Sequence, residues 1–243
     1  MDYIVYFIFP FVLGLIGKKL LGQKFKVFII GLISFFIAWI ICQTISGILT
    51  SYNIKEGMLI YTLIISLSAG IFEETARYIV FSKFKIFQDN KNWNSSIMYA
   101  LGHHGMETII VGFGLLLTFL IIKYKPDAIS DPQLLENSKS VLELGFWVKI
   151  YNSFERLLVG LIIHSSYTCV VVLSFIKSDK KYFLLAIAWH FLHDMISFNI
   201  HRISEYWIVS KSWVLIIVIL YSYLLFRFWR MMKKENIIHN NLG

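Results

Sequence analysis

Ionisable side chains interrupt four long apolar runs of the sequence, at spacings that suit a shared helix face. Glu73 and Arg77 are four residues apart, which places both side chains on one side of a helix. The groups inside the runs are Glu73, Glu74, Arg77, His103, His104, Glu107, His164, His190, His193 and Asp194. An ionisable group at the centre of a bilayer costs about 2.5–3.5 kcal/mol on insertion scales, so such groups are functional candidates by default.

These residue types point to the activation of water. A glutamate beside a histidine in one cavity can act as a general base, and a second histidine can stabilise an oxyanion. Arg77 can hold one carboxylate ionised through its planar guanidinium. Zinc is a further option, because catalytic zinc sites use three nitrogen or oxygen ligands and a water, and the candidate ligands are His104, His164 and His190. The sequence contains neither HExxH nor GxSxG, which argues against a zincin and against a serine nucleophile.

The spacing also assigns expected positions to the individual groups. The candidate catalytic residues are Glu73, Glu74, Arg77, His104, Glu107, His164, His190 and Asp194. Adjacent helical residues point about 100° apart, so one of His103 and His104 is expected to enter the site. His193 is expected in a supporting position, and Glu155 with Arg156 is expected to form an ion pair at the outer boundary. The glycines Gly70, Gly102, Gly105, Gly112, Gly114 and Gly160 suit either close helix approach or ordinary packing.

The composition identifies the elements that must position these groups. The chain has 243 residues, of which 57% are hydrophobic and 16% charged, whereas soluble domains average about 45–50% and about 25%. Long apolar runs contradict the alternating strands of a barrel, so an all-α polytopic membrane protein is expected. The basic residues are not gathered in one patch, which argues against a nucleic-acid partner.

Seven membrane spans are expected, in one integral membrane domain that covers residues 1–243. The spans are about 3–17, 27–49, 58–82, 95–122, 154–176, 182–200 and 211–229. The first follows Met1 and Asp2 without a basic region before it, so it is expected to be a retained helix that Pro10 tilts or kinks. The third to sixth spans form the expected four-helix catalytic core, about residues 58–200.

Basic residues predict the orientation of the chain. Fourteen lie beside the ends of spans 1, 3, 5 and 7: Lys18, Lys19, Lys24, Lys26, Lys83, Lys85, Lys91, Lys177, Lys180, Lys181, Arg227, Arg230, Lys233 and Lys234. Seven lie on the other side: Lys55, Lys123, Lys125, Lys139, Lys149, Arg202 and Lys211. The positive-inside rule therefore places the chain in the cell membrane with the N-terminus outside and the C-terminus in the cytoplasm.

The ionisable groups also share one depth. At about 1.5 Å per residue, Glu73 and Glu74 lie roughly 12–14 Å from the inner end of their span. The corresponding depths are roughly 14 Å for His104, roughly 18 Å for His164 and roughly 12 Å for His190. Four helices are therefore expected to bring these groups into one layer, in the cytoplasmic half of the bilayer.

The connection over about 123–153 is long enough for an element of its own. Asp131 and Pro132 favour a helix start, and apolar residues from Leu134 to Trp147 alternate with charged ones. This pattern predicts an amphipathic helix on the outer surface, with an ordinary ordered loop as the alternative.

The ordered motifs resemble the superfamily of CAAX-type intramembrane proteases, which includes PrsW and the YhfC family. The similarity to the YhfC family is the greater. It rests on the EExxRY string from Glu73 to Tyr78 and on the glycine-flanked histidine motif from Gly102 to Glu107. The third and fourth motifs are His164 and the pair His190 and Asp194, so the resemblance covers about residues 58–200.

The resemblance implies an intramembrane endopeptidase. In that interpretation one of Glu73 and Glu74 is the general base, a histidine helps to activate water, and the other histidines shape the oxyanion site or bind metal. Zinc is compatible with the family, while the glutamate mechanism of CAAX relatives requires none. The chain departs from the CAAX pattern at Arg77, Glu107 and Thr168, which leaves the roles of single residues open.

The expected partners are the lipid bilayer and a peptide or membrane-protein substrate, cut near the cytoplasmic half of the bilayer. Two other functions fit the same residues. One is a noncatalytic membrane scaffold or an immunity-type binding protein. The other is a proton-coupled transporter, since intramembrane chains of glutamate and histidine also mark proton relays, although no inverted repeat supports it.

Overall fold

The computed structural model describes residues 4–88, 91–129, 135–136, 138–139, 143–203 and 207–241, and no strand occurs among them. The helices are α1 (Ile4–Leu21), α2 (Phe25–Ser51), α3 (Leu59–Lys83), α4 (Lys85–Gln88), α5 (Trp93–Tyr124), the 3-10 helix η1 (Pro126–Ala128), α7 (Phe146–Ile176), α8 (Lys181–Ile203) and α9 (Trp207–Asn241). The expected all-α architecture is confirmed.

Seven of these helices are long and apolar enough to cross a membrane, which confirms the number of expected spans. The largest differences in length are at α7 and α9, because α7 has 31 residues and α9 has 35, and both begin before the expected spans at 154 and 211. The first span is helical through Pro10, which is buried. Because it begins early, α7 carries His164 well away from both of its ends.

The outer surface helix is the part of the expected fold that changes. Gly145 is the N-cap of α7, so Phe146 and Trp147 begin this membrane-spanning helix and do not end a separate one. The expected start at Asp131 and Pro132 lies outside the described residues. Gly145 separates α7 from the residues before it, and the sequence pattern did not mark this glycine as a boundary because apolar residues stand on both of its sides.

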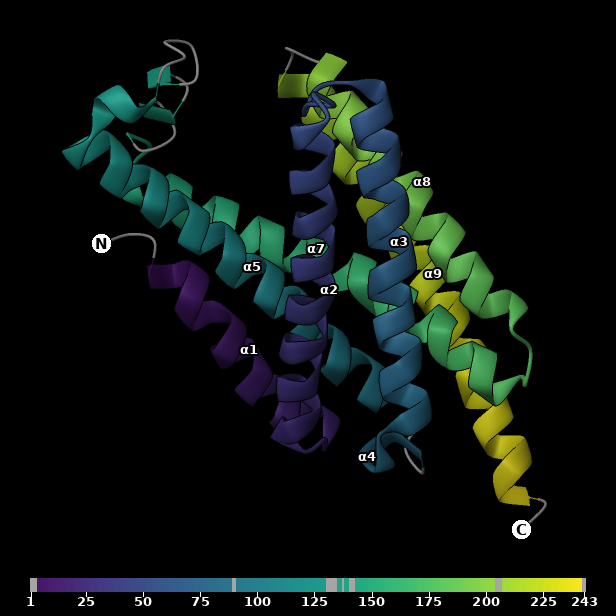
Figure 1. The fold of residues 1–243 in the computed structure, drawn as a ribbon. Helices are drawn as coiled ribbons and strands as arrows, with labels where there is room; N and C mark the ends of the chain where they lie inside the picture. Colours follow the sequence, from purple (N-terminus) through teal and green to yellow (C-terminus); the bar gives the residue numbers. More distant parts are fainter. Residues whose placement is uncertain are drawn as a thin grey trace.

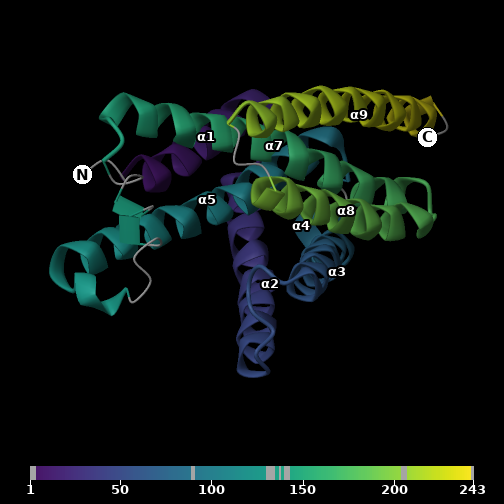
Figure 2. The same ribbon diagram turned by 90° about the horizontal axis from the view of Figure 1, so that it is seen from above.

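The helices pack so that α5 and α7 form the centre of the molecule. α5 contacts α1, α2 and α7, while α7 also contacts α8 and α9. α3 lies between α2 and α8 (Figure 1). From above, α2 and α3 lean away from the layer that contains α5, α7, α8 and α9 (Figure 2).

Local signals explain where α5 begins and how closely it packs. Asn92 and Ser95 form a reciprocal capping box that satisfies the first free amides of α5. Gly31 of α2 and Gly102 of α5 let the two backbones meet: a Cβ on Gly102 would collide with the carbonyl of Phe28. This crossing fixes the direction in which the next residues, His103 and His104, project.

Candidate active site

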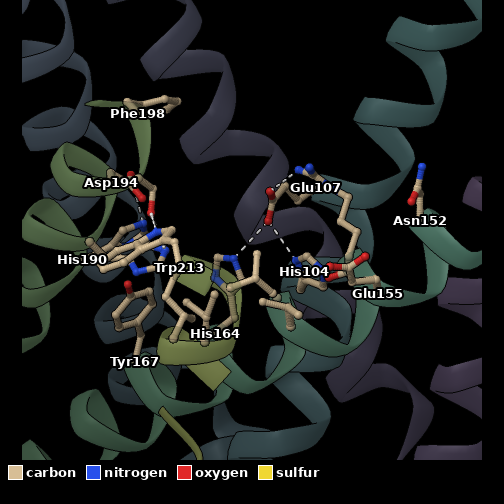
Figure 3. Close-up of a pocket in the computed structure, with 18 of the residues that line it drawn as sticks. His104, Glu107, Asn152, Glu155, His164, Tyr167, His190, Asp194, Phe198 and Trp213 are labelled. Carbon is tan, nitrogen blue, oxygen red and sulfur yellow. Dashed lines mark hydrogen bonds and ion pairs between the residues drawn. The ribbon is translucent and has the colours of Figure 1, made fainter. Parts of the chain in front are cut away.

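A cavity of about 490 Å³ lies between α5, α7, α8 and α9. Its walls include the apolar side chains of Val159, Ile163, Phe198, Trp213 and Ile217. Its polar lining includes His104, Glu107, Arg156, His164, His190 and Asp194 (Figure 3). The cavity therefore combines apolar walls with groups that can exchange protons, inside the membrane-spanning part of the chain.

Arg77 of α3 connects the paired glutamates to the histidine of α7. Its guanidinium is buried, with Nη1 donating to Glu74 Oε1 and Nη2 donating to His164 Nδ1 over 2.8 Å. A guanidinium has only donors, so His164 Nδ1 accepts and the ring proton lies on Nε2. That Nε2 donates to Glu107 Oε2 over 3.0 Å. Arg77 thus sets the tautomer of His164 and aims its N–H at Glu107.

Glu107 of α5 is held by three donors. Its Oε2 accepts from His104 Nδ1 over 2.8 Å as well as from His164. Its Oε1 accepts from Arg156 Nη2 over 2.6 Å. A carboxylate bound in this way keeps little capacity to take up a further proton, so Glu107 suits a positioning or ligand role better than that of a base.

Glu73 of α3 is held more loosely. Its Oε2 accepts from His103 Nε2 over 2.8 Å, while Arg77 Nη2 lies 3.6 Å away. The side chain of Glu73 is 11% exposed, whereas that of Glu74 is fully buried. Of the two adjacent glutamates, Glu73 is therefore the more accessible, and neither is among the residues that line the cavity.

His190 of α8 lies between three carboxylates. Its Nδ1 donates to Glu74 Oε1 over 2.7 Å. Its Nε2 lies 3.5 Å from Asp194 Oδ2 and 4.0 Å from Glu73 Oε2. These two separations are long for direct hydrogen bonds and suit a bridging water. The Tyr167 ring stacks on His190 with centroids 4.5 Å apart, and the Tyr167 hydroxyl lies 2.9 Å from that of Tyr221.

Both His103 and His104 form hydrogen bonds with a glutamate, but only His104 lines the cavity, as expected for two adjacent helical residues. Their ring centroids lie 5.1 and 5.2 Å from that of His164. The two rings diverge along α5, and His164 of α7 projects between them. His103 faces Glu73 on one side, and His104 faces Glu107 on the other.

The predicted ion pair between Glu155 and Arg156 was also wrong. Arg156 turns to Glu107, and Glu155 pairs with Lys211 of α9, whose Nζ lies 2.7 Å from both of its carboxylate oxygens. Adjacent helical residues cannot share a face, and each found a partner on a different helix. Arg156, Gly160 and His164 follow one another at intervals of four residues, so they share one face of α7. This spacing could have placed Arg156 on the same side as His164.

Two glycines allow the site helices to approach. A Cβ on Gly160 of α7 would collide with the ring of His104. A Cβ on Gly70 of α3 would lie 2.8 Å from the carbonyl oxygen of Ile187 in α8. Close packing at these glycines brings α5 to α7 and α3 to α8. Gly114 faces open space, so it takes no part in such a contact.

The remaining predicted or missed residues lie around this core. His193 lines the cavity, with Nε2 3.4 Å from Ser197 Oγ. Tyr167 was missed by the sequence analysis, because an aromatic residue in an apolar run carries no signal of its neighbours. Glu74 Oε2, Arg77 Nε and His103 Nδ1 are buried without a hydrogen-bond partner in the described protein. Buried polar atoms of this kind are groups to which a water or an ion can supply the missing hydrogen bond.

Two groups of side chains have the composition of a metal site. Glu73, His103 and His164 form one, and His104, Glu107 and His164 form the other, with ligand atoms within 4.8 Å of one another in each. Arg77 Nη2 lies 2.8 Å from His164 and 3.6 Å from Glu73, so a fixed cation already occupies the first group.

The second group is the better zinc candidate, because it has the donor types of catalytic zinc sites and all three residues line the cavity. Arg77 donates to His164 Nδ1, so His164 Nε2 carries a proton and could bind zinc only after losing it. Two of the expected ligands, His104 and His164, belong to it, and Glu107 is the third. His190 belongs to neither group found among the described residues.

The fold and the cavity define a multi-pass membrane protein with a buried cluster of glutamate, histidine and arginine. A family model described as YhfC intramembrane metalloprotease matches residues 5–219, and the chain belongs to this family. It is also similar to the uncharacterized membrane protein YhfC of Bacillus subtilis (strain 168), with 26% identity over 74% of each chain. No solved structure matches. The family expected from the motifs is thus confirmed, and it is one of intramembrane metalloproteases.

Proposed function

We propose that this protein is an intramembrane endopeptidase that hydrolyses a peptide bond of a membrane-associated peptide or protein with activated water. The observation that carries the proposal is the arrangement around His190 Nε2, which faces Glu73 at 4.0 Å and Asp194 at 3.5 Å beside a cavity of about 490 Å³. The space between these groups suits one water, and the cavity has the size of a small-ligand or peptide site. The family to which the chain belongs supports the same class of activity.

Glu73 is the proposed general base. A water between Glu73 and His190 loses a proton to the Glu73 carboxylate as its oxygen attacks the peptide carbonyl carbon. When the C–N bond breaks, the leaving amine takes that proton from Glu73, so the carboxylate is restored. Glu73 suits this task because His103 is its one hydrogen-bond donor among the described residues, and its side chain is partly accessible.

The other charged groups position the reacting ones. Glu74 accepts from Arg77 and His190, and it thereby holds His190 Nε2 toward Glu73. Tyr167 stacks on one face of the His190 ring and so restricts its rotation. Zinc, when bound by His104, Glu107 and His164, would supply Lewis-acid polarisation of the carbonyl or the water. The layer that contains these groups lies, in our proposal, in the half of the bilayer next to the lysine-rich loops.

The test is a comparison of peptide termini in membranes from cells that express the parent chain or Glu73→Gln. We expect a set of new termini with the parent that Glu73→Gln reduces at least about 100-fold, the size of effect typical of a general base. Glu56→Gln is the matched control, since Glu56 is exposed in the turn before α3. Termini that persist in both Glu73→Gln and Glu74→Gln would contradict hydrolysis by this site and favour the noncatalytic scaffold.

A further inference from the structure

The cavity extends from the reactive groups toward one end of the helix bundle. On α7 its lining residues run from Asn152 to Tyr167, and on α8 they run from His190 to Phe198. α7 spans Phe146–Ile176 and α8 spans Lys181–Ile203, so the lining covers the first part of α7 and the second part of α8. Because the two helices are antiparallel, these parts lie at the same end.

α9 gives the same direction independently. Its lining residues are Lys211, Trp213, Val214 and Ile217, all in the first third of a helix that begins at Trp207. Figure 3 shows Asn152 and Phe198 on either side of the cavity, beyond His104 and His190 as seen from Tyr167. The described part of the chain contributes no lining residue from the other side of the reactive layer, on α7 after Tyr167 or on α8 before His190.

The charges of the chain distinguish the two ends. The mouth of the cavity lies at the ends of α7, α8 and α9 that adjoin residues 125–145 and 204–206. The opposite ends of these helices adjoin Lys177, Lys180 and Lys181 and the basic C-terminal segment, which belong to the side with fourteen Lys and Arg against seven. An excess of this kind marks the cytoplasmic side.

We infer that the cavity opens to the extracytoplasmic side, and that the peptide it takes is an apolar segment presented from that side. The nature of the occupant rests on the proposed function, whereas the direction of access does not. The walls formed by Val159, Ile163 and Ile217 suit apolar side chains. Arg156 gives the segment an anchor: its side chain is 39% exposed, and its Nη2 bond to Glu107 leaves further N–H groups to donate to a backbone carbonyl.

An ion pair between α7 and α9 lies at the entrance of the cavity. Lys211 Nζ lies 2.7 Å from both carboxylate oxygens of Glu155, which ties the start of α9 to α7. Because Glu155 pairs with Lys211, Arg156 has Glu107 as its carboxylate partner and keeps further N–H groups for a peptide. The segment thus passes a polar entrance before it reaches the apolar walls.

The direction is tested by thiol labelling in intact cells with a charged, membrane-impermeant methanethiosulfonate. Asn152→Cys places a thiol at the mouth, and Val159→Cys places one deeper on the same cavity wall. Leu158→Cys is the matched control for depth, because Leu158 is 40% exposed and does not line the cavity. Gln88→Cys is the matched control for side, because Gln88 is the exposed last residue of α4, on the side of the lysine-rich loops. The unmodified chain, with buried Cys169 and partly buried Cys42, gives the background.

We expect Asn152→Cys and Val159→Cys to react from outside, Leu158→Cys to stay unreactive, and Gln88→Cys to react only after permeabilisation. If Asn152→Cys and Val159→Cys react only after permeabilisation, the cavity does not open to the extracytoplasmic side. If Asn152→Cys alone reacts from outside, the opening does not extend to Val159, and the inference that the cavity is open from that side is overturned. Neither result depends on hydrolysis, so the labelling can fail while the Glu73→Gln comparison succeeds, or the reverse. If both hold, the Glu73-dependent termini should fall in apolar segments that enter the bilayer from the extracytoplasmic side, and termini in cytoplasmic segments would contradict the assignment of the substrate.

Discussion

Glu107 accepts hydrogen bonds from His104, His164 and Arg156, whereas Glu73 accepts one, from His103, within the described part of the chain. Both carboxylates belong to the same network, and Arg77 links the two through His164. The donors around Glu107 fix its position and use its lone pairs. Glu73 keeps an oxygen free to take a proton from water.

The difference separates two requirements that a buried ionic site must meet. One carboxylate must hold the helices in register, since charged groups without partners are costly inside a membrane. The other must keep an oxygen without a hydrogen-bond donor, so that it can accept a proton from water. The comparison therefore predicts that substitutions near Glu107 cost stability first, and that substitution of Glu73 costs activity first.

The largest loss of stability is expected from Glu107→Gln. An amide has one oxygen acceptor and presents N–H groups to the remaining donors, so the histidines and Arg156 lose partners. Breaking a buried charge pair typically costs about 3–5 kcal/mol, and solvent at this partly exposed group reduces that figure. The measurement is the unfolding midpoint of the purified protein in detergent. Glu155→Gln is the control, because it removes only the partly exposed pair with Lys211. An equal fall of the unfolding midpoint in both variants would contradict the claim that the bonds to Glu107 hold the helices together.

Gly160→Ala comes next. The new methyl group would collide with the His104 ring, and overpacking of this kind costs about 1–3 kcal/mol. Displacement of His104 should also weaken any zinc bound with Glu107 and His164, which metal analysis of the purified variant would measure. Gly114→Ala is the matched control, because that position faces open space and alanine favours a helix by about 0.5–1 kcal/mol. Comparable destabilisation by both changes would show that the His104 contact does not limit the helix spacing.

The smallest effect is expected from Tyr167→Phe. This change keeps the ring that stacks on His190 and removes the hydroxyl that lies 2.9 Å from Tyr221, so it should cost about 1 kcal/mol in unfolding free energy. Processing should fall by only a few fold, because the His190 ring remains supported. Tyr223→Phe on the exposed side of α9 serves as the reference. Complete loss of processing in Tyr167→Phe would mean that the hydroxyl acts on substrate directly.

The membrane-spanning helices could be predicted from the sequence because each contains enough apolar residues to cross a bilayer. The ionisable stripe of α3 was equally visible, since Glu73 and Arg77 stand out in an apolar run. Both features depend only on neighbours along the chain.

Contacts between helices could not be predicted in the same way. The rings of His103 and His104 both lie beside His164 because Gly160 lets α7 approach α5 closely. Arg156 reaches Glu107 because α7 begins at Phe146 and carries Arg156 inside the bundle. These positions depend on how far apart the packed helices lie and how each is rotated about its axis. Neither quantity can be inferred from the identity of a single residue.

The most direct test of the account measures product formation and the unfolding midpoint on the same purified samples of Glu73→Gln and Glu107→Gln. For Glu73→Gln we predict an unchanged midpoint and a fall in product formation of at least about 100-fold, because the amide still accepts from His103 but cannot take a proton from water. Glu107→Gln should show the lowered midpoint. Product formation at the parent rate by Glu73→Gln would contradict the central claim that Glu73 activates the water.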